Sequence, residues 1–222
     1  MDALGEQGYT GSINERIQAN LFDLYGTTNI NVGLSKAGGF KKYFEDNFLG
    51  VVNYVAQLDG ATQYWQLSEE IPLPVGYSYE MDVLYEASNL SENDYLATGE
   101  GDTNSPLFFV NREFLDSGSA GRLSTPSVDG GGNKLPYDGA FHTISVTSLN
   151  NSASVGILGA RFSYTRNSSG IISMFRVRNS SGVVVNEIPL TNKAQGATQI
   201  ATVGSVNATM INYTGDEWEQ SS

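Results

Sequence analysis

The residue of this chain best suited to acid–base chemistry is His142, the only histidine among its 222 residues. A hydrolase of the Ser-His-Asp type would have to use His142 as its base. Alternate side chains of a strand share a face, and this alternation puts His142 on the face of Ile144 and Val146. Because buried polar groups are normally hydrogen-bonded, the pattern predicts a hydrogen-bonded core histidine instead of a catalytic base.

Paired carboxylates are the second candidate, because glycosidases work with two acidic side chains. Glu80 and Asp82 match the first half of the E-x-D-x-x-E arrangement found on one strand of sandwich glycosidases. Tyr85 stands where the next acid would be. Both acids also alternate onto the polar face of their strand, where a solvated position is expected. The sequence therefore predicts no catalytic residue and a protein that is not an enzyme.

Two oxygen-rich loops could hold calcium, which prefers several hard oxygen ligands. They are Glu86–Asp102 and Asp129–Asp138, and neither has the D-x-D-x-D-G spacing of a dedicated calcium loop. No metal ligand and no cofactor is assigned from the sequence, and Ca²⁺ stays an open alternative.

Sugar binding requires an aromatic platform with polar neighbours. Two loop positions offer this pair, Tyr95 beside Asp94 and Tyr137 beside Asp138. Loop tyrosines also serve in ordinary packing, so the alternative is a purely structural role for both.

Composition and charge exclude several classes of protein. The formal net charge is −12, whereas nucleic-acid binding relies on clustered Lys and Arg, so no nucleic-acid partner is expected. The absence of cysteine excludes disulfides and thiolate chemistry. No apolar run is long enough to cross a bilayer and no signal peptide is visible, so we expect no membrane insertion. The protein is expected to be either cytoplasmic or released by a route that needs no signal, such as lysis.

The predicted secondary structure that must position these residues changes from helix to strand near residue 50. Residues 11–25 predict a helix, in which Ser12 and Glu15 form a capping box. A second helix is expected over Lys36–Phe48. The apolar stripe of the first helix, which must be buried against its own domain or against other copies or proteins, consists of Ile13, Ile17, Leu21 and Leu24. Residues 1–49 are therefore expected to form a helical segment for attachment or oligomerisation.

Residues 50–222 predict a mainly β domain, because Gly and turn clusters separate short alternating segments and only 16% of the chain is charged. Tyr77–Tyr85 is the strongest segment, with large residues at every second position. Glu86–Asn104 is expected to be a polar loop. The strands expected in the central stretch begin at His142 and continue at Ser154–Leu158, Ala160–Tyr164 and Ile171–Arg178. Strands in succession without helices between them favour an antiparallel sandwich.

The order of these segments resembles the concanavalin A-like, laminin-G-type jelly-roll sandwich. The resemblance rests on Asp138-Gly-Ala-Phe-His142, which opens a strand after a turn, and on Val155-Gly-Ile-Leu-Gly159. Ser169-Gly-Ile-Ile172 fits the following hairpin in part, and Phe141 stands where Trp is commoner. The resemblance covers residues 50–218 and implies an antiparallel jelly-roll β-sandwich.

The two ends of the chain resemble structural proteins of tailed bacteriophages. The opening Gly8-Tyr-Thr-Gly-Ser-Ile-Asn-Glu15 is similar to their G-x-T-G-S-(I/L)-N-(D/E) opening. The closing Ala208-Thr-Met-Ile-Asn-Tyr213, followed by Trp218, is similar to an A-x-x-I-N-Y…W closing of their sandwich domains. This resemblance implies a virion protein, as capsid decoration, head fibre or tail fibre or spike. It would form a homotrimer and bind other virion proteins. The alternative is a lectin-like module that binds host surface glycans.

Overall fold

The computed structural model describes residues 54–85, 94–99, 107–110, 114–117, 121–151, 153–161 and 167–220. The chain divides into two compact units, Met1–Asn53 and Tyr54–Ser222, and everything below concerns the second. The two helices predicted from the sequence, with the stripe Ile13, Ile17, Leu21 and Leu24, lie outside the described residues. Within those ranges no helix has the length and apolarity needed to span a membrane.

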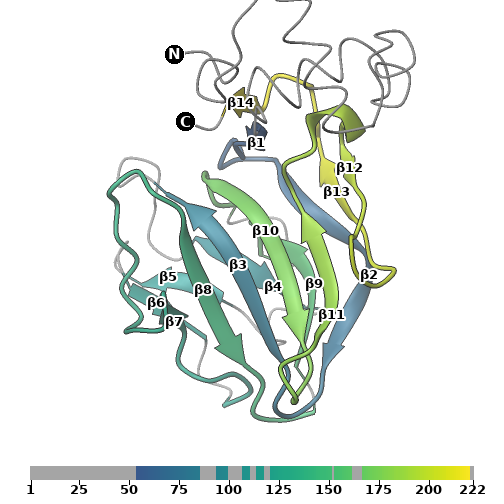
Figure 1. Cartoon of the computed structure of the whole chain (residues 1–222). Helices are drawn as coiled ribbons and strands as arrows, with labels where there is room; N and C mark the ends of the chain where they lie inside the picture. The colour runs from purple at the N-terminus through teal and green to yellow at the C-terminus, as the bar shows by residue number, and fades with distance from the viewer. Residues whose placement is uncertain are drawn as a thin grey trace, which may run out of the picture. The chain divides into compact units, whose positions relative to one another are not determined.

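Regular structure in the described ranges is almost entirely β (Figure 1). The strands are β1 (Tyr54–Ala56), β2 (Tyr64–Leu73), β3 (Ser78–Leu84), β4 (Tyr95–Thr98), β5 (Leu107–Val110), β6 (Phe114–Asp116), β7 (Ser127–Val128), β8 (His142–Thr147), β9 (Ala153–Leu158), β10 (Ile171–Arg178), β11 (Val184–Pro189), β12 (Thr198–Gln199), β13 (Ala208–Ile211) and β14 (Trp218–Gln220). One 3-10 turn, η2 (Lys193–Gln195), precedes β12.

The strands form two large sheets and a small one. One large sheet has five strands in the order β11-β10-β3-β8-β7, and the other has seven in the order β12-β13-β2-β9-β4-β5-β6. β1 pairs with β14 in a separate two-stranded sheet. All of these strand pairs are antiparallel. The predicted antiparallel, mainly β, sandwich-like fold is confirmed.

The core lies between the two large sheets, because buried apolar residues alternate strictly with outward-facing residues along the strands. On β3 every second residue, Tyr79, Met81 and Val83, is fully buried, while the residues between them are half-buried on the outer face. The largest fully buried side chains are Trp65 of β2, Tyr79 and Phe175 of β10. Since apolar burial contributes about 25 cal/mol per Å², these large residues dominate the stability of the sandwich.

Each long side of the sandwich is closed by a connecting segment. On one side the chain after β7 pairs with β6, through a bridge between Phe114 and Lys134 and a hydrogen bond from the Leu115 amide to Asn133 (2.9 Å). On the other side the chain after β12 pairs with β11, through a bridge between Glu187 and Val203. We call these the β6–β7 side and the β11–β12 side.

Several segments differ from the sequence prediction. β4 occupies part of the stretch expected to be a polar loop, and its residues Leu96–Thr98 are buried. β2 continues through Pro72, and its register shifts between Gln66 and Ile71 before pairing with β9 resumes. The chain bends at Gly159 (φ 81°) and Ala160, so neither Ala160 nor Arg161 lies in a strand, and the rest of the strand expected at Ala160–Tyr164 lies outside the described residues. Alternation alone could not reveal these turns and bulges.

Candidate functional site

The turn after β7 directs a carboxylate back onto β8. Asp129 and Gly130 both have positive φ (50° and 75°), and the turn closes with a bond from the Val128 amide to the Gly132 carbonyl (2.9 Å). Asp129 then holds Thr143 twice: its amide donates to the Thr143 carbonyl, and its Oδ1 accepts from the Thr143 amide, both at 2.9 Å. The Gly-rich sequence allows this reversal because glycine adopts positive φ at little cost.

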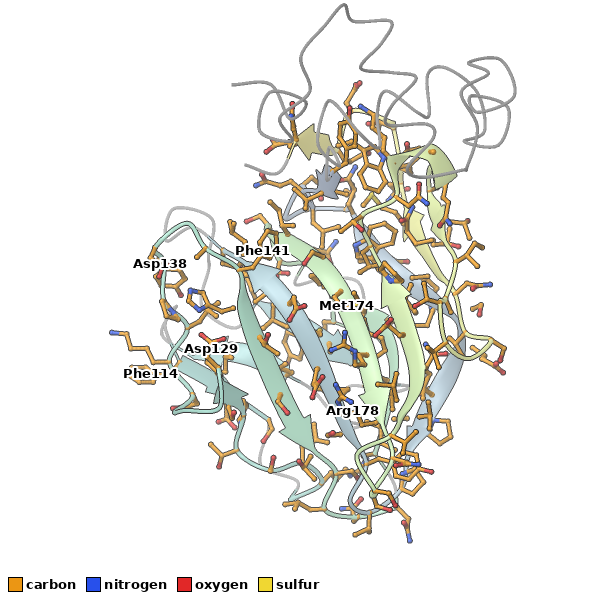
Figure 2. All side chains as sticks on the ribbon, viewed as in Figure 1. Phe114, Asp129, Asp138, Phe141, Met174 and Arg178 are labelled. Carbon is orange, nitrogen blue, oxygen red and sulfur yellow. The ribbon has the colours of Figure 1, made fainter. Side chains whose placement is uncertain are left out.

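His142 joins this turn to the loop before β8. Its Nδ1 lies 2.6 Å from Asp129 Oδ2, and its Nε2 lies 3.0 Å from Asp138 Oδ1. The His142 side chain is only 11% exposed, whereas the two carboxylates are 52% and 57% exposed. Figure 2 shows Asp138 at the outer margin of the loop before β8 and Asp129 beside the start of β8. We call Asp129, His142 and Asp138 the carboxylate–histidine clasp.

Electrostatics favour the charged form of the clasp. The hydrogen bond to Asp129 raises the pKa of His142, and the bond to Asp138 adds to this, against the opposing effect of burial. The hydrogen bond to His142 in turn lowers the pKa of Asp129 and of Asp138. When the His142 ring is protonated, both of its nitrogens donate, one to each carboxylate, and the clasp then joins the turn after β7 to the loop before β8.

The prediction of a hydrogen-bonded histidine is confirmed, but its position differs from the one expected. His142 lies at the first residue of β8, at the rim of the sheet, and its partners are surface carboxylates instead of core groups. The sequence contained a signal that was missed. Two Asp-Gly turns precede the single histidine, and one of them places Asp138 four residues before it.

Exposed aromatic rings lie on the same side of the sandwich. Phe114 is 44% exposed, and the ammonium of Lys134 lies 5.8 Å from its ring centroid, within the range of a cation–π contact. Phe141, next to His142, is 37% exposed. The loop that carries Phe141 is anchored from below by Leu135, which is fully buried in the core.

The four residues predicted to bind glycans have different environments. Asp94 is buried, and Tyr95 is half-buried with the guanidinium of Arg161 5.7 Å from its ring centroid. Tyr137 packs against the core. Burial raises the pKa of the Tyr85 phenol, and the charges of Asp94 and Tyr137 raise it further. Of the four, Asp138 alone is exposed at the surface.

A cross-strand ion-pair ladder covers the outer face of the five-stranded sheet. Arg176 of β10 bonds Glu187 of β11 (2.7 Å) and Glu80 of β3 (3.2 Å), and Arg178 bonds Glu80 (2.9 Å). The hydrogen bond to Glu187 raises the pKa of Arg176. Glu80 is the residue that matched half of a glycosidase pattern. Its negative charge is thus balanced by two arginines.

A hollow of about 640 Å³ lies next to the β1–β14 pair. Its lining includes the acidic residues Asp59, Asp216, Glu217 and Glu219. Glu217 is buried and accepts bonds from Gln63 Nε2 (2.6 Å), Thr214 and Gly215. Burial opposes its ionisation, but these donors outweigh burial and lower its pKa. In the described ranges no group of three or more His, Asp or Glu side chains is arranged to hold a metal ion. Most of the candidate calcium loop Glu86–Asp102 lies outside the described residues.

Comparisons of the chain with protein-family models, with curated proteins and with solved structures found no match. The physical basis for any assignment of function is therefore the fold, together with the carboxylate–histidine clasp, the exposed aromatic rings, the ion-pair ladder and the acidic hollow.

Proposed function

We propose that this chain is a non-enzymatic structural protein of a tailed-bacteriophage virion. Its N-terminal segment, residues 1–49, attaches it to capsid or tail, and its sandwich, of the concanavalin A-like jelly-roll type, is displayed outward as decoration, fibre or spike. The chain assembles in the host cytoplasm as a homotrimer. The resemblance of the two chain ends to phage structural proteins motivates this assignment.

One structural observation carries the proposal. β1 begins at Tyr54, directly after the N-terminal unit, and pairs along its length with β14, so the first and last strands of the sandwich lie side by side. Gln57 also bridges to Ile171 at the start of β10. β10 then runs eight residues away, about 26 Å at the rise of a strand, to the turn at Asn179–Gly182. Such a module is held at one end and free at the other.

The polar groups of the sandwich support a structural role. Both ring nitrogens of the single histidine lie within hydrogen-bond distance of carboxylates, and the charges of both arginines of β10 are balanced by glutamates. These charges hold loops and strands together, as expected of a rigid displayed domain.

The test uses full-length protein in particles of the phage that encodes it. The double substitution Ile17→Asp, Leu21→Asp places charges in the apolar stripe, and we expect the copy number per particle to fall at least tenfold. Gln18→Asp, which lies off the stripe, is the matched control and should incorporate normally. Normal incorporation of the stripe variant would refute the proposed attachment.

A lectin-like receptor-binding module is the second candidate. It is favoured by the exposure of Phe141 and of Asp138, three residues apart in the loop before β8, since sugars stack on aromatic rings and donate hydroxyls to carboxylates. A glycan array tests it: specific binding that is lost in Phe141→Ala and kept in Val75→Ala would support this role, and an array without binding would reject it.

A further inference from the structure

The two carboxylates of the carboxylate–histidine clasp are anchored to the sandwich in different ways. Asp129 is held by Thr143 through two bonds that do not involve His142: the Asp129 amide donates to the Thr143 carbonyl, and Asp129 Oδ1 accepts from the Thr143 amide, both at 2.9 Å. The turn itself is closed by a bond from the Gly131 amide to the Val128 carbonyl (2.8 Å). These bonds keep Asp129 beside β8 independently of the histidine.

Asp138 lacks comparable support from the described residues. Apart from its contact with His142 Nε2, its side chain accepts a bond from the Ala140 amide (3.0 Å), which belongs to the same loop. The Asp138 side chain is 57% exposed, and nothing lies within 4 Å of a Cβ placed on the next residue, Gly139. The contact with His142 is therefore the link that joins the Asp138 side chain to the sheet.

The segment that depends on this link is short and has a fixed residue on each side. Before it, Tyr137 packs against the core, and after it, His142 pairs with Val83 of β3. The residues between them, Asp138–Phe141, are all exposed. A segment of this kind can gain or lose order while the sandwich stays folded, because local opening involves little buried surface.

The protonation state of His142 decides how many links the clasp contains. Its two nitrogens lie 2.6 Å from Asp129 Oδ2 and 3.0 Å from Asp138 Oδ1. A protonated ring donates from both nitrogens, whereas a neutral ring donates from one and has a lone pair on the other. A lone pair that faces a carboxylate is repelled by it, so a neutral ring can keep one of the two links.

The charges around His142 come from two segments of the described chain. Asp129 acts on it from the turn after β7, and Asp138 acts on it from the loop before β8. The neighbouring strand β3 places Asp82 on the outer face of the sheet, and Lys134 of the loop lies over the ring of Phe114. The two aspartates are therefore the groups that set the charge of the ring.

We propose that the clasp is a pH-dependent latch on the segment Asp138–Phe141. With a proton on His142, both carboxylates are held and the segment is ordered. When that proton is lost to water, the ring keeps its shorter link to Asp129, whose position is fixed by Thr143, and Asp138 turns into solvent, which frees the segment.

The sign of the effect follows from the chemistry of the ring. Both carboxylates raise the pKa of His142 above 6.5, so the latch is closed at and below about pH 6.5 and opens as the pH rises through the raised value. The latch makes the order of the exposed Phe141 depend on pH. It goes beyond the proposed function, because it requires neither attachment nor a bound ligand.

Site-directed spin labelling tests the latch, because the chain has no cysteine of its own and an introduced cysteine is labelled alone. Full-length Ala140→Cys carries a nitroxide inside the segment. Gly132→Cys is the matched control in the turn held by Thr143, at a position where a Cβ has nothing within 4 Å. Between about pH 5.5 and about pH 9.5, we expect the rotational correlation time of the label at residue 140 to fall about twofold or more and that at residue 132 to stay constant.

The substitution His142→Asn, combined with Ala140→Cys, assigns the response to the histidine. Asparagine does not take up a proton in this range, so we expect a mobile label at every pH. Circular dichroism verifies that all variants fold. Three results would overturn the latch: a label at residue 140 that does not respond to pH, an equal response at residue 132, or a response that persists with His142→Asn. None of them bears on the attachment of the N-terminal segment, which the particle experiment tests separately.

Discussion

At the scale of single residues, His142 shows how a rim position differs from a core position. Its ring is mostly enclosed, yet both nitrogens meet carboxylates that face solvent. Ion pairs of this kind contribute modestly, because water screens the exposed partners. These two ion pairs fix both ends of the loop between Asp129 and Asp138 beside the start of β8.

The clasp predicts a definite dependence of stability on pH. The folded pKa of His142 is raised above 6.5, so its contribution is complete below about pH 6.5 and is lost as the pH rises through the folded value. The folded pKa values of Asp129 and Asp138 are lowered below 3.8, so their contribution is complete above about pH 3.8 and is lost as the pH falls through the folded values. The clasp therefore contributes most between these limits.

Urea unfolding of the parent and of His142→Asn, from about pH 3 to pH 9, measures this contribution. We expect the difference in unfolding free energy to be largest between about pH 4 and pH 6.5 and to shrink on either side. A difference that grows toward alkaline pH would contradict the protonated clasp.

A second residue-scale prediction concerns Tyr79. Its ring packs 6.1 Å from that of Phe175, but its hydroxyl is fully buried with no hydrogen-bond partner among the described residues. Burial raises its pKa, so the phenol stays neutral. Tyr79→Phe keeps the packing and removes an unpaired polar group, so we expect unchanged stability or a gain of up to about 1 kcal/mol. Tyr79→Ala should lose about 3–5 kcal/mol. Thermal or urea unfolding that shows a clear loss for Tyr79→Phe would reveal a partner for the hydroxyl.

At the scale of elements, the approach to β10 depends on close packing around a glycine. The Gly170 carbonyl accepts a bond from the Leu58 amide (3.0 Å), and a Cβ at Gly170 would overlap the ring of Tyr85. Tyr85 is fixed by a bond between its hydroxyl and that of Ser168 (2.7 Å), so it has little freedom to move.

We expect Gly170→Ala to destabilise the sandwich by about 2–3 kcal/mol, because overpacking forces the ring or the strand to shift. Gly132→Ala is the matched control, since nothing lies within 4 Å of a Cβ at that position. The control should be neutral or slightly stabilising. Equal unfolding midpoints for the two variants would show that Tyr85 yields easily.

The elements also show how far the sequence could predict the fold. Alternation predicted β3, β8 and β10 closely, because large buried residues at every second position reveal a core strand. It missed β4 and β6, which are short and lie beside polar segments, and it missed the bulge that lets β2 continue past Gln66. Such features depend on neighbouring strands, which a local pattern does not contain.

The sequence also predicted the candidate site residues only in part. The sequence placed Asp138 on the surface loop before β8 but did not predict its contact with His142. It proposed Asp94 and Tyr137 as binding residues, and the fold buries Asp94 and packs Tyr137 against the core. Tertiary packing alone decides which polar residue of a loop faces inward.

At the scale of the whole molecule, the sandwich is proposed to be held at one end. The β1–β14 pair fixes both ends of this unit together, and β10 leads from there to the turn at Asn179–Gly182. This arrangement suits the displayed module proposed above.

Electron cryo-microscopy of the intact phage particle tests the central claim most directly. The account predicts density for three sandwiches around an axis, each with its β1–β14 pair toward the particle and the turn at Asn179–Gly182 pointing away from it. Particles without this density, or sandwiches attached through the turn at Asn179–Gly182, would contradict the account.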